Sequence, residues 1–282
     1  MSTTFALVGP GAMGAGLSAR LVARGAQVLT TLEGRSDASR ARAQAAGMTD
    51  VAPAALMQAP VFLSVVPPAE ALAMARQFAS WCVGVDQPPR YVDLNAVNPD
   101  TVHEVQAVIE AAGATFVDGC IVGFPPKGDE IGPTLYVSRD AADLAEALNA
   151  HGVVTQLLDG GVGAASALKM AYAGLSKGVA ALGVAMVLAA ERHGAGEALR
   201  AALAETRPGL LALLDRGLPD LLPKAWRWAP EMEQIADFIG HHRPEAAIYT
   251  AMASQYRAVA QDLAGSGEEA AVLRAFPQLG DD

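Results

Sequence analysis

The glycine-rich stretch at residues 9–14 constrains the fold of this chain more than any other feature. An apolar run, residues 5–8, leads directly into Gly-Pro-Gly-Ala-Met-Gly, and apolar residues spaced three or four apart follow it. A strand, a glycine turn and a helix start in this order form the context in which a GxGxxG pattern binds a dinucleotide. The sequence therefore predicts a nucleotide site at the first strand and helix.

Each glycine has its own physical role in such a turn. Gly9 permits the tight turn, Gly11 lets the backbone approach a pyrophosphate, and Gly14 lets the helix pack against the strand. The pyrophosphate would rest on the free N–H groups near Ala12 and Met13, at the positive end of the helix dipole. An ordinary glycine turn without a ligand is the alternative, because GxGxxG alone is a weak signal.

The end of the second predicted strand, residues 27–32, bears on the choice of cofactor. An acidic residue there binds the ribose 2′-hydroxyl of NAD, whereas an arginine accommodates the 2′-phosphate of NADP. The chain offers both, with Glu33 followed by Arg35, Ser36 and Arg40. Arginine binds phosphate through charge-assisted, bidentate contacts, so we expect NADP to be preferred to NAD. The alternative is that the two arginines lie on the solvated face of a surface helix.

Strand-like and helical segments alternate up to about residue 160. Further strands are expected at residues 61–66, 91–94 and 115–118, and residues 135–137 and 153–157 are expected to extend the sheet. This alternation predicts an α/β fold, an N-terminal Rossmann domain with a doubly wound parallel sheet. Ligands of such sheets bind beyond the carboxyl ends of the strands, which points to Val66, Pro67, Asn95 and the segment after Asp118.

The pattern changes near Gly160, beyond which only helices are expected. We predict a dinucleotide-binding domain over residues 1–160 and an all-α domain for substrate binding and dimerisation over residues 161–282. A long interdomain helix at residues 164–193 is apolar nearly all the way round, which predicts burial on every side. The tail after Gly265 is expected to be weakly anchored.

Composition excludes several classes of function. The net charge of −10 argues against a nucleic-acid partner and against an anionic membrane surface. Two cysteines provide neither a disulfide framework nor a metal-ligand cluster, so no metal is expected. No signal peptide is recognisable, and the longest apolar stretch, residues 178–190, is too short to span a bilayer. We expect a cytoplasmic globular protein.

Lys169 stands out for its chemistry. It lies two turns into the long apolar helix, with Tyr172, Ala173 and Ser176 on the same face. Burial and a nearby helix N-terminus both lower the pKa of a lysine, which suits a general acid or base. The alternative is a lysine whose amine reaches solvent from a packed helix. Lys177 ranks behind it for the same role.

Several segments together carry a resemblance to a known family. They are residues 9–14 (GPGAMG), Val66-Pro67, residues 93–99 (DLNAVNP), residues 118–123 (DGCIVG), and residues 161–163 followed by Lys169. In that order they match the GxGxMG opening, the cleft-lining Leu-Pro, the D-x-S-T-x-x-P turn, the substrate-binding D-A-P-V-S-G and the GxGxxxxxK segment of β-hydroxyacid dehydrogenases. The chain resembles that family, the short relatives of 6-phosphogluconate dehydrogenase, and especially its NAD-binding 6-phosphogluconate dehydrogenase-like branch. The resemblance implies that Lys169 is the catalytic lysine.

The departures from the family pattern fall in the substrate pocket. The serine that holds a substrate carboxylate is replaced by Val122, which leaves only backbone N–H groups around Gly123 for that role. The asparagine four residues after the lysine is Ala173, and the serine and threonine of the strand-end motif are Asn95 and Ala96. A simple 3-hydroxy acid is therefore not the expected substrate.

The resemblance implies an NAD(P)-dependent oxidoreductase that transfers hydride between a nicotinamide cofactor and a small hydroxy- or oxo-acid. The nicotinamide is expected between the sheet domain and the long helix, with Lys169 exchanging the hydroxyl proton. Asn95 and the backbone around Gly123 would position the substrate. One alternative is an NADPH-dependent imine reductase, in which another residue typically replaces this lysine. The other is a non-catalytic NADP-binding sensor, which the changes at Val122 and Ala173 favour.

Further candidates for the pocket lie in the helical half. Residues 226–228 (Trp-Arg-Trp) and 241–243 (His-His-Arg) cluster polar and aromatic groups, although cations also suit a surface helix end. Lys127, in a proline-rich loop, could lie over the cleft, and Cys120 is expected in the core. Related dehydrogenases pair two subunits through this half, so we expect a homodimer.

Overall fold

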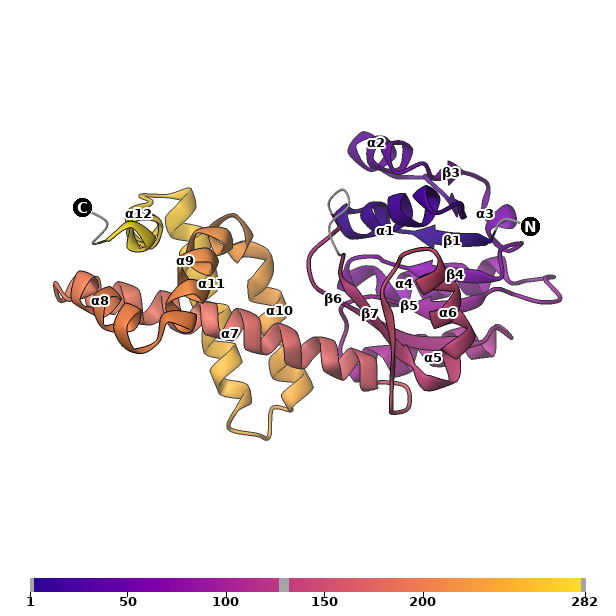
Figure 1. Ribbon diagram of the computed structural model, residues 1–282. Coiled ribbons are helices and arrows are strands. Elements are labelled where there is room, and N and C mark those ends of the chain that lie inside the picture. Colours follow the sequence, from indigo (N-terminus) through magenta and orange to yellow (C-terminus); the bar gives the residue numbers. More distant parts are fainter. Residues whose placement is uncertain (1–2, 127–131, 280–282) are drawn as a thin grey trace. The chain divides into compact units, whose positions relative to one another are not determined.

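The computed structural model describes residues 3–126 and 132–279. The first of its two compact units, residues 1–170, contains one sheet of eight strands in its described part (Figure 1). The strand order is β3-β2-β1-β4-β5-β6-β7-β8. Strands β1 to β6 pair in parallel, whereas β7 runs antiparallel to β6 and parallel to β8. The strands are β1 (Thr4–Val8), β2 (Gln27–Thr30), β3 (Thr49–Asp50), β4 (Val61–Ser64), β5 (Arg90–Asp93), β6 (Phe116–Val122), β7 (Thr134–Ser138) and β8 (Thr155–Leu158).

Helices cover both faces of this sheet because its strands are apolar on both sides. Alternate side chains of β1 enter different cores: Phe5 and Leu7 pack on one face, and Ala6 and Val8 on the other. The first face is covered by α1 (Ala12–Ala23), α2 (Asp37–Ala45) and α6 (Ala142–Ala150). The second is covered by α3 (Pro53–Leu56), α4 (Ala71–Trp81) and α5 (Pro99–Ala111). The predicted doubly wound Rossmann architecture is confirmed.

Local capping fixes where two of these helices begin. The Ser36 hydroxyl accepts a hydrogen bond from the Ser39 N–H at 3.3 Å, which starts α2 one residue later. The Asn98 side chain accepts from the Thr101 N–H at 2.8 Å, and Pro99 occupies the first position of α5. Both are the side-chain types that satisfy free N–H groups at helix starts.

The second unit, residues 171–282, is helical throughout its described part. Its central helix, α7 (Ala164–Arg192), begins within the first unit and continues through the second. The Tyr256 hydroxyl donates to the Lys177 carbonyl at 2.6 Å and the Gln255 amide donates to the Ala181 carbonyl at 3.0 Å, so α11 is fixed along α7. The other helices are α8 (Gly196–Thr206), α9 (Pro208–Leu221), α10 (Ala225–Ile239), α11 (Ala246–Ala264) and α12 (Glu268–Ala275).

The helix α7 is buried on one side only, contrary to the expectation of burial all round. Ala181 and Val184 are fully buried, whereas Leu175, Leu182 and Met186 are exposed by 70%, 57% and 59%. By length and composition α7 is also the one helix among the described residues that could cross a membrane, a test that core helices of soluble proteins pass as well. Within its most apolar 18-residue window, 44% of α7 is buried inside the protein.

Two further boundaries bear on the predictions. The two compact units divide after Met170, inside α7, and the domain boundary near Gly160 stays a prediction. The tail after Gly265 forms α12, which is anchored by the fully buried side chains of Leu273 and Phe276. Lys127 lies outside the described residues.

Gly14 provides a test of the packing between α1 and β1. A Cβ at Gly14 would lie 2.2 Å from the Gly9 carbonyl oxygen, so we expect Gly14→Ala to cost about 2 kcal/mol of unfolding free energy through overpacking. At Gly217 in α9 a Cβ would meet nothing within 4 Å. The matched Gly217→Ala is expected to stabilise by up to about 1 kcal/mol, because alanine favours a helix interior.

Urea denaturation followed by circular dichroism measures both variants. Equal effects of the two substitutions would contradict the close approach of α1 to the glycine turn.

Candidate functional site

The parallel strands β1, β4 and β5 end level with one another at the carboxyl edge of the sheet, and β6 continues beyond that level to Val122. Val8 of β1 pairs with Ser64 of β4, Ser64 with Asp93 of β5, and Asp93 with Asp118 of β6. Parallel strands are spaced about 4.8 Å apart, so this row crosses roughly 14 Å of the sheet. The turns that follow these strands therefore lie on the edge where open α/β sheets bind ligands.

The glycine turn after β1 has the geometry expected of a nucleotide cradle. Gly9 has a φ of +98°, and a Cβ there would lie 2.1 Å from the Val65 carbonyl oxygen, so only glycine fits. At Gly11, by contrast, a Cβ would meet nothing within 4 Å. The open space at Gly11 faces the start of α1, where the N–H groups of Ala12 and Met13 have no acceptor within the helix. These residues fit a dinucleotide pyrophosphate.

The residues predicted to select NADP follow β2 directly. Glu33 is exposed, and the Arg35 guanidinium lies 3.5 Å from the Glu70 carboxylate. The Arg40 guanidinium turns back on its own loop, donating to the Leu32 carbonyl at 2.6 Å and the Arg35 carbonyl at 3.2 Å. It also lies 4.0 Å from the Asp50 carboxylate. In this structure Arg40 shapes the loop, which is a role the sequence did not indicate.

Asn95 forms the centre of a buried polar cluster between β4 and β5. Its side-chain oxygen accepts from the Val66 N–H at 2.7 Å, and its amide donates to the Ser64 hydroxyl at 3.0 Å and the Asp93 carboxylate at 2.9 Å. The Asn95 side chain is only 2% exposed. These bonds set the course of the backbone at Val66-Pro67, the segment predicted to line the nucleotide site.

That Asn95 positions the substrate stays a prediction, and the hydrogen bonds of its side chain bear on it. An amide has two donor hydrogens and one acceptor oxygen, and all of them are used inside the protein. Direct contact with a ligand would require breaking buried hydrogen bonds, each with a cost of about 1–3 kcal/mol. Asn95 therefore acts in this structure by positioning the strand ends.

Asp93 is a buried carboxylate with an altered proton affinity. Its side chain is 0% exposed, and desolvation raises its pKa to about 7. The two hydrogen bonds from Asn95 oppose this rise, and the charge of the neighbouring Asp118 adds to it. Burial therefore favours the protonated form of the Asp93 carboxyl.

Asp118 joins the sheet to the first turn of α7. Its carboxylate accepts from the Gly163 N–H at 2.8 Å, the Ala165 N–H at 3.0 Å and the Ser166 hydroxyl at 3.0 Å. The side chain is 0% exposed, and burial raises its pKa even though these three donors lower it. A carboxylate at a helix N-terminus also interacts favourably with the helix dipole. Asp118 thus fixes the start of the helix that carries Lys169.

The Lys169 amine lies one turn beyond Ser166, at the end of β6. It donates a hydrogen bond to the Ile121 carbonyl at 2.6 Å. Ile121 lies past the row that ends at Asp118, in the part of β6 that pairs with β7 only, so the amine lies beyond the carboxyl edge. Burial lowers the pKa of Lys169. The side chain is therefore anchored in the first unit, on the same edge as the glycine turn.

The neighbours of Lys169 on β6 are mainly apolar. Cys120 is fully buried and burial raises its pKa to about 12, as expected for a core thiol. Val122 is half-buried, and Gly123 is exposed with a φ of +122°. The proposed use of the Gly123 backbone for substrate stays a prediction.

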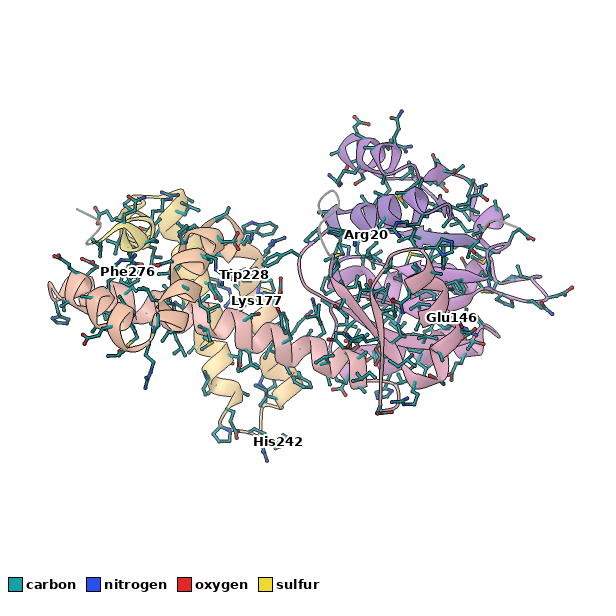
Figure 2. The ribbon with its side chains drawn as sticks, in the orientation of Figure 1. Arg20, Glu146, Lys177, Trp228, His242 and Phe276 are labelled. Carbon is teal, nitrogen blue, oxygen red and sulfur yellow. The ribbon has the colours of Figure 1, made fainter. Side chains whose placement is uncertain are left out.

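The second-ranked candidates lie in the helical unit. Lys177 forms an ion pair with Glu231, and its amine lies 5.6 Å from the centre of the Trp228 ring (Figure 2). These contacts give Lys177 a structural role between α7 and α10. Trp226 is exposed on α10, and residues 241–243 line a surface hollow of about 650 Å³ with one face of α11. Both segments belong to the second unit, whereas the glycine turn belongs to the first.

Two functional candidates were missed from the sequence. Asp118 was noted only as part of a motif, because the helix start that it caps lies 45 residues away. The sequence motifs also do not indicate Arg42, whose guanidinium donates to the Pro10 carbonyl at 2.9 Å, inside the glycine turn. The arginine repeat on α2 is the one local signal that could have indicated it.

Comparison with known proteins agrees with this geometry. Residues 4–168, more than half of the chain, match the model of the NAD binding domain of 6-phosphogluconate dehydrogenase, and residues 190–259 match a domain of unknown function, DUF1932. No curated protein matches the chain.

Among solved structures, the conserved protein MTH1747, described as similar to 3-hydroxyacid dehydrogenases, is 27% identical with a TM-score of 0.75, covering 96% of this chain and 99% of its own. A Mycobacterium tuberculosis 3-hydroxyisobutyrate dehydrogenase solved with L-serine is 19% identical with a TM-score of 0.73, covering 98% and 99%. A Myxococcus stipitatus imine reductase is 18% identical with a TM-score of 0.57, covering 98% and 99%. The last two likenesses show the fold alone.

The raised pKa of Asp93 predicts a pH dependence of stability. Between the ordinary value of 3.8 and about 7, the folded chain holds this proton more tightly than the unfolded chain does. The contribution of Asp93 to stability is therefore full below this window and is lost as the pH rises through it. Asp93→Asn cannot ionise, so its stability relative to wild type should increase from pH 4 to pH 7 on the order of 1–3 kcal/mol.

Urea unfolding of both proteins across this pH range provides the measurement. A difference between them that does not vary with pH would show that the Asp93 carboxylate titrates normally.

Proposed function

Because this chain belongs to the family of the NAD binding domain of 6-phosphogluconate dehydrogenase, we propose that it transfers hydride between NADP and a small hydroxy- or oxo-acid. The family makes it an NAD(P)-dependent oxidoreductase of the hydroxyacid dehydrogenase type. The observation that carries the proposal is the position of the Lys169 amine, held at the Ile121 carbonyl on the same sheet edge as the glycine turn. Such an amine is placed to exchange a proton with a bound substrate.

Lys169 has the properties of a general acid and base. Burial lowers its pKa from the ordinary 10.5, so both protonation states are more accessible near neutral pH than for a surface lysine. The bond to Ile121 uses one donor and fixes the direction of the amine. The ammonium form can donate a proton to a carbonyl oxygen, and the neutral form can accept one from a hydroxyl. A bound nicotinamide supplies or accepts the hydride.

The cofactor would be held mainly by the first unit. Gly9, Gly11 and the start of α1 bind the pyrophosphate, and Val66-Pro67, positioned by Asn95, line the nucleotide. Arg35 and Ser36 follow β2, where the ribose substituent is recognised, which supports NADP over NAD. Arg40 would support this loop through its bonds to Leu32 and Arg35.

Lys169→Ala tests the catalytic role. We expect turnover to fall by about 10²–10⁴-fold, the usual contribution of a positioned acid or base, while NADPH binding is retained. In wild type, a plot of turnover against pH should show the transition of this amine at a pH below 10.5, the ordinary pKa of a lysine. Hydroxy- and oxo-acids form the substrate panel, and NADPH absorbance and calorimetric titration measure turnover and binding.

Lys224→Ala, at a half-buried lysine of the helical unit that pairs with Asp220, is the matched control and should leave both quantities unchanged. Gly11→Ala is the complementary variant, and it should lose NADPH binding because its methyl enters the open space at the cradle. Unaltered turnover in Lys169→Ala would end the catalytic assignment.

Two other functions give different results in the same assays. An imine reductase would consume NADPH with cyclic imines and not with oxo-acids. A sensor would bind NADPH and turn over neither class. Lys169 favours the dehydrogenase over both. In imine reductases another residue typically replaces this lysine, and a non-catalytic sensor has no need of a buried amine hydrogen-bonded at a strand end.

We also propose that the chain forms a homodimer through α7. Leu175, Leu182 and Met186 are exposed and lie seven and four residues apart, so they share one face of the helix. Exposed apolar faces of this kind mark association surfaces. Sedimentation equilibrium should give a dimer for wild type and a monomer for Leu182→Glu. A monomeric wild type would contradict the proposal.

A further inference from the structure

Arg42, on α2, connects the glycine turn to the start of its own helix. Its Nε donates to the Pro10 carbonyl at 2.9 Å, between the first two glycines of the cradle, and one terminal nitrogen donates to the Ser39 hydroxyl at 3.0 Å. The Ser39 hydroxyl in turn lies 3.2 Å from that of Ser36. A hydrogen-bonded chain thus runs from the glycine turn to the start of α2, with the guanidinium in its middle.

The charge of Arg42 is not compensated within the described residues. Arg35 lies 3.5 Å from Glu70 and Arg40 lies 4.0 Å from Asp50, whereas no carboxylate of the described residues lies within 4.0 Å of Arg42. A guanidinium has five N–H donors, and the two bonds above use two of them. Arg42 therefore presents a fixed positive charge with three donors available, beside the cradle.

The surroundings of Arg42 are those of an anion site. Gly11 leaves open space at the turn that Arg42 contacts, and the first N–H groups of α1 lie there with the positive end of its dipole. A planar guanidinium forms short, charge-assisted pairs with phosphate oxygens. Arg40, by contrast, donates two of its N–H groups to carbonyl groups of its own loop.

We propose that Arg42 binds a phosphate group of the dinucleotide. The inference rests on the proposed function, because it assumes that the glycine turn holds a nicotinamide dinucleotide. The phosphate is either the 2′-phosphate on the adenosine ribose or the pyrophosphate. The two differ in one respect that can be measured, since only NADP carries the first and both cofactors carry the second.

Calorimetric titration of NADPH and NADH into Arg42→Gln tests the proposal. Loss of a charged hydrogen bond should raise the Kd for NADPH by about tenfold or more. A rise for NADPH alone assigns Arg42 to the 2′-phosphate, and an equal rise for both nucleotides assigns it to the pyrophosphate. A Kd within about twofold of wild type for both nucleotides would overturn the proposal.

Two further variants separate charge from loop structure. Arg76→Gln, an exposed arginine on α4, is the matched control and should leave both affinities unchanged. Arg42→Lys keeps the charge but loses the Nε bond to Pro10, so it should bind better than Arg42→Gln. If it binds as poorly, the effect comes from the lost tie to the loop, and the phosphate contact is overturned. Failure of wild type to bind either nucleotide would overturn the proposed function itself, which distinguishes the two failures.

Discussion

The hydrogen bonds that the Asp118 carboxylate accepts from the first turn of α7 are the interaction on which the candidate site depends. They fix the start of α7 against the sheet. One turn later the same helix places Lys169 at the Ile121 carbonyl, on the strand that carries Asp118. The amine and the carboxylate are therefore held by one strand and one helix, and their separation follows from the geometry of these two elements.

The local parts of this design could be predicted from the sequence. The glycine turn needs only residues 9–14, and the strand before it and helix after it are set by neighbouring residues. The alternation of apolar strands and helices predicted a doubly wound sheet for the same reason. Lys169 was identified because a lysine within a long apolar helix is conspicuous whatever its surroundings.

The parts that were missed depend on contacts between distant segments. A motif gives the type of residue at Asn95 but not the direction of its amide, which the Val66 N–H and the Ser64 hydroxyl determine. The strand β6 continues past Asp118 because it gains β7 as an antiparallel partner, which no pattern in residues 119–122 reveals. The uniform apolarity of α7 concealed its exposed side, since composition alone does not tell which face a neighbouring helix covers.

The buried cluster around Asn95 also bears on how the sheet assembles. Strands such as β4 and β5 are apolar on both faces, so a shift of one residue would leave their hydrophobic burial almost unchanged. Such a shift would carry the Asn95 amide away from Ser64 and Val66, and would leave polar groups of the interior without partners. The polar atoms that shape the ligand-binding edge therefore also set the register of the strands. They select one pairing from several that would bury similar apolar area.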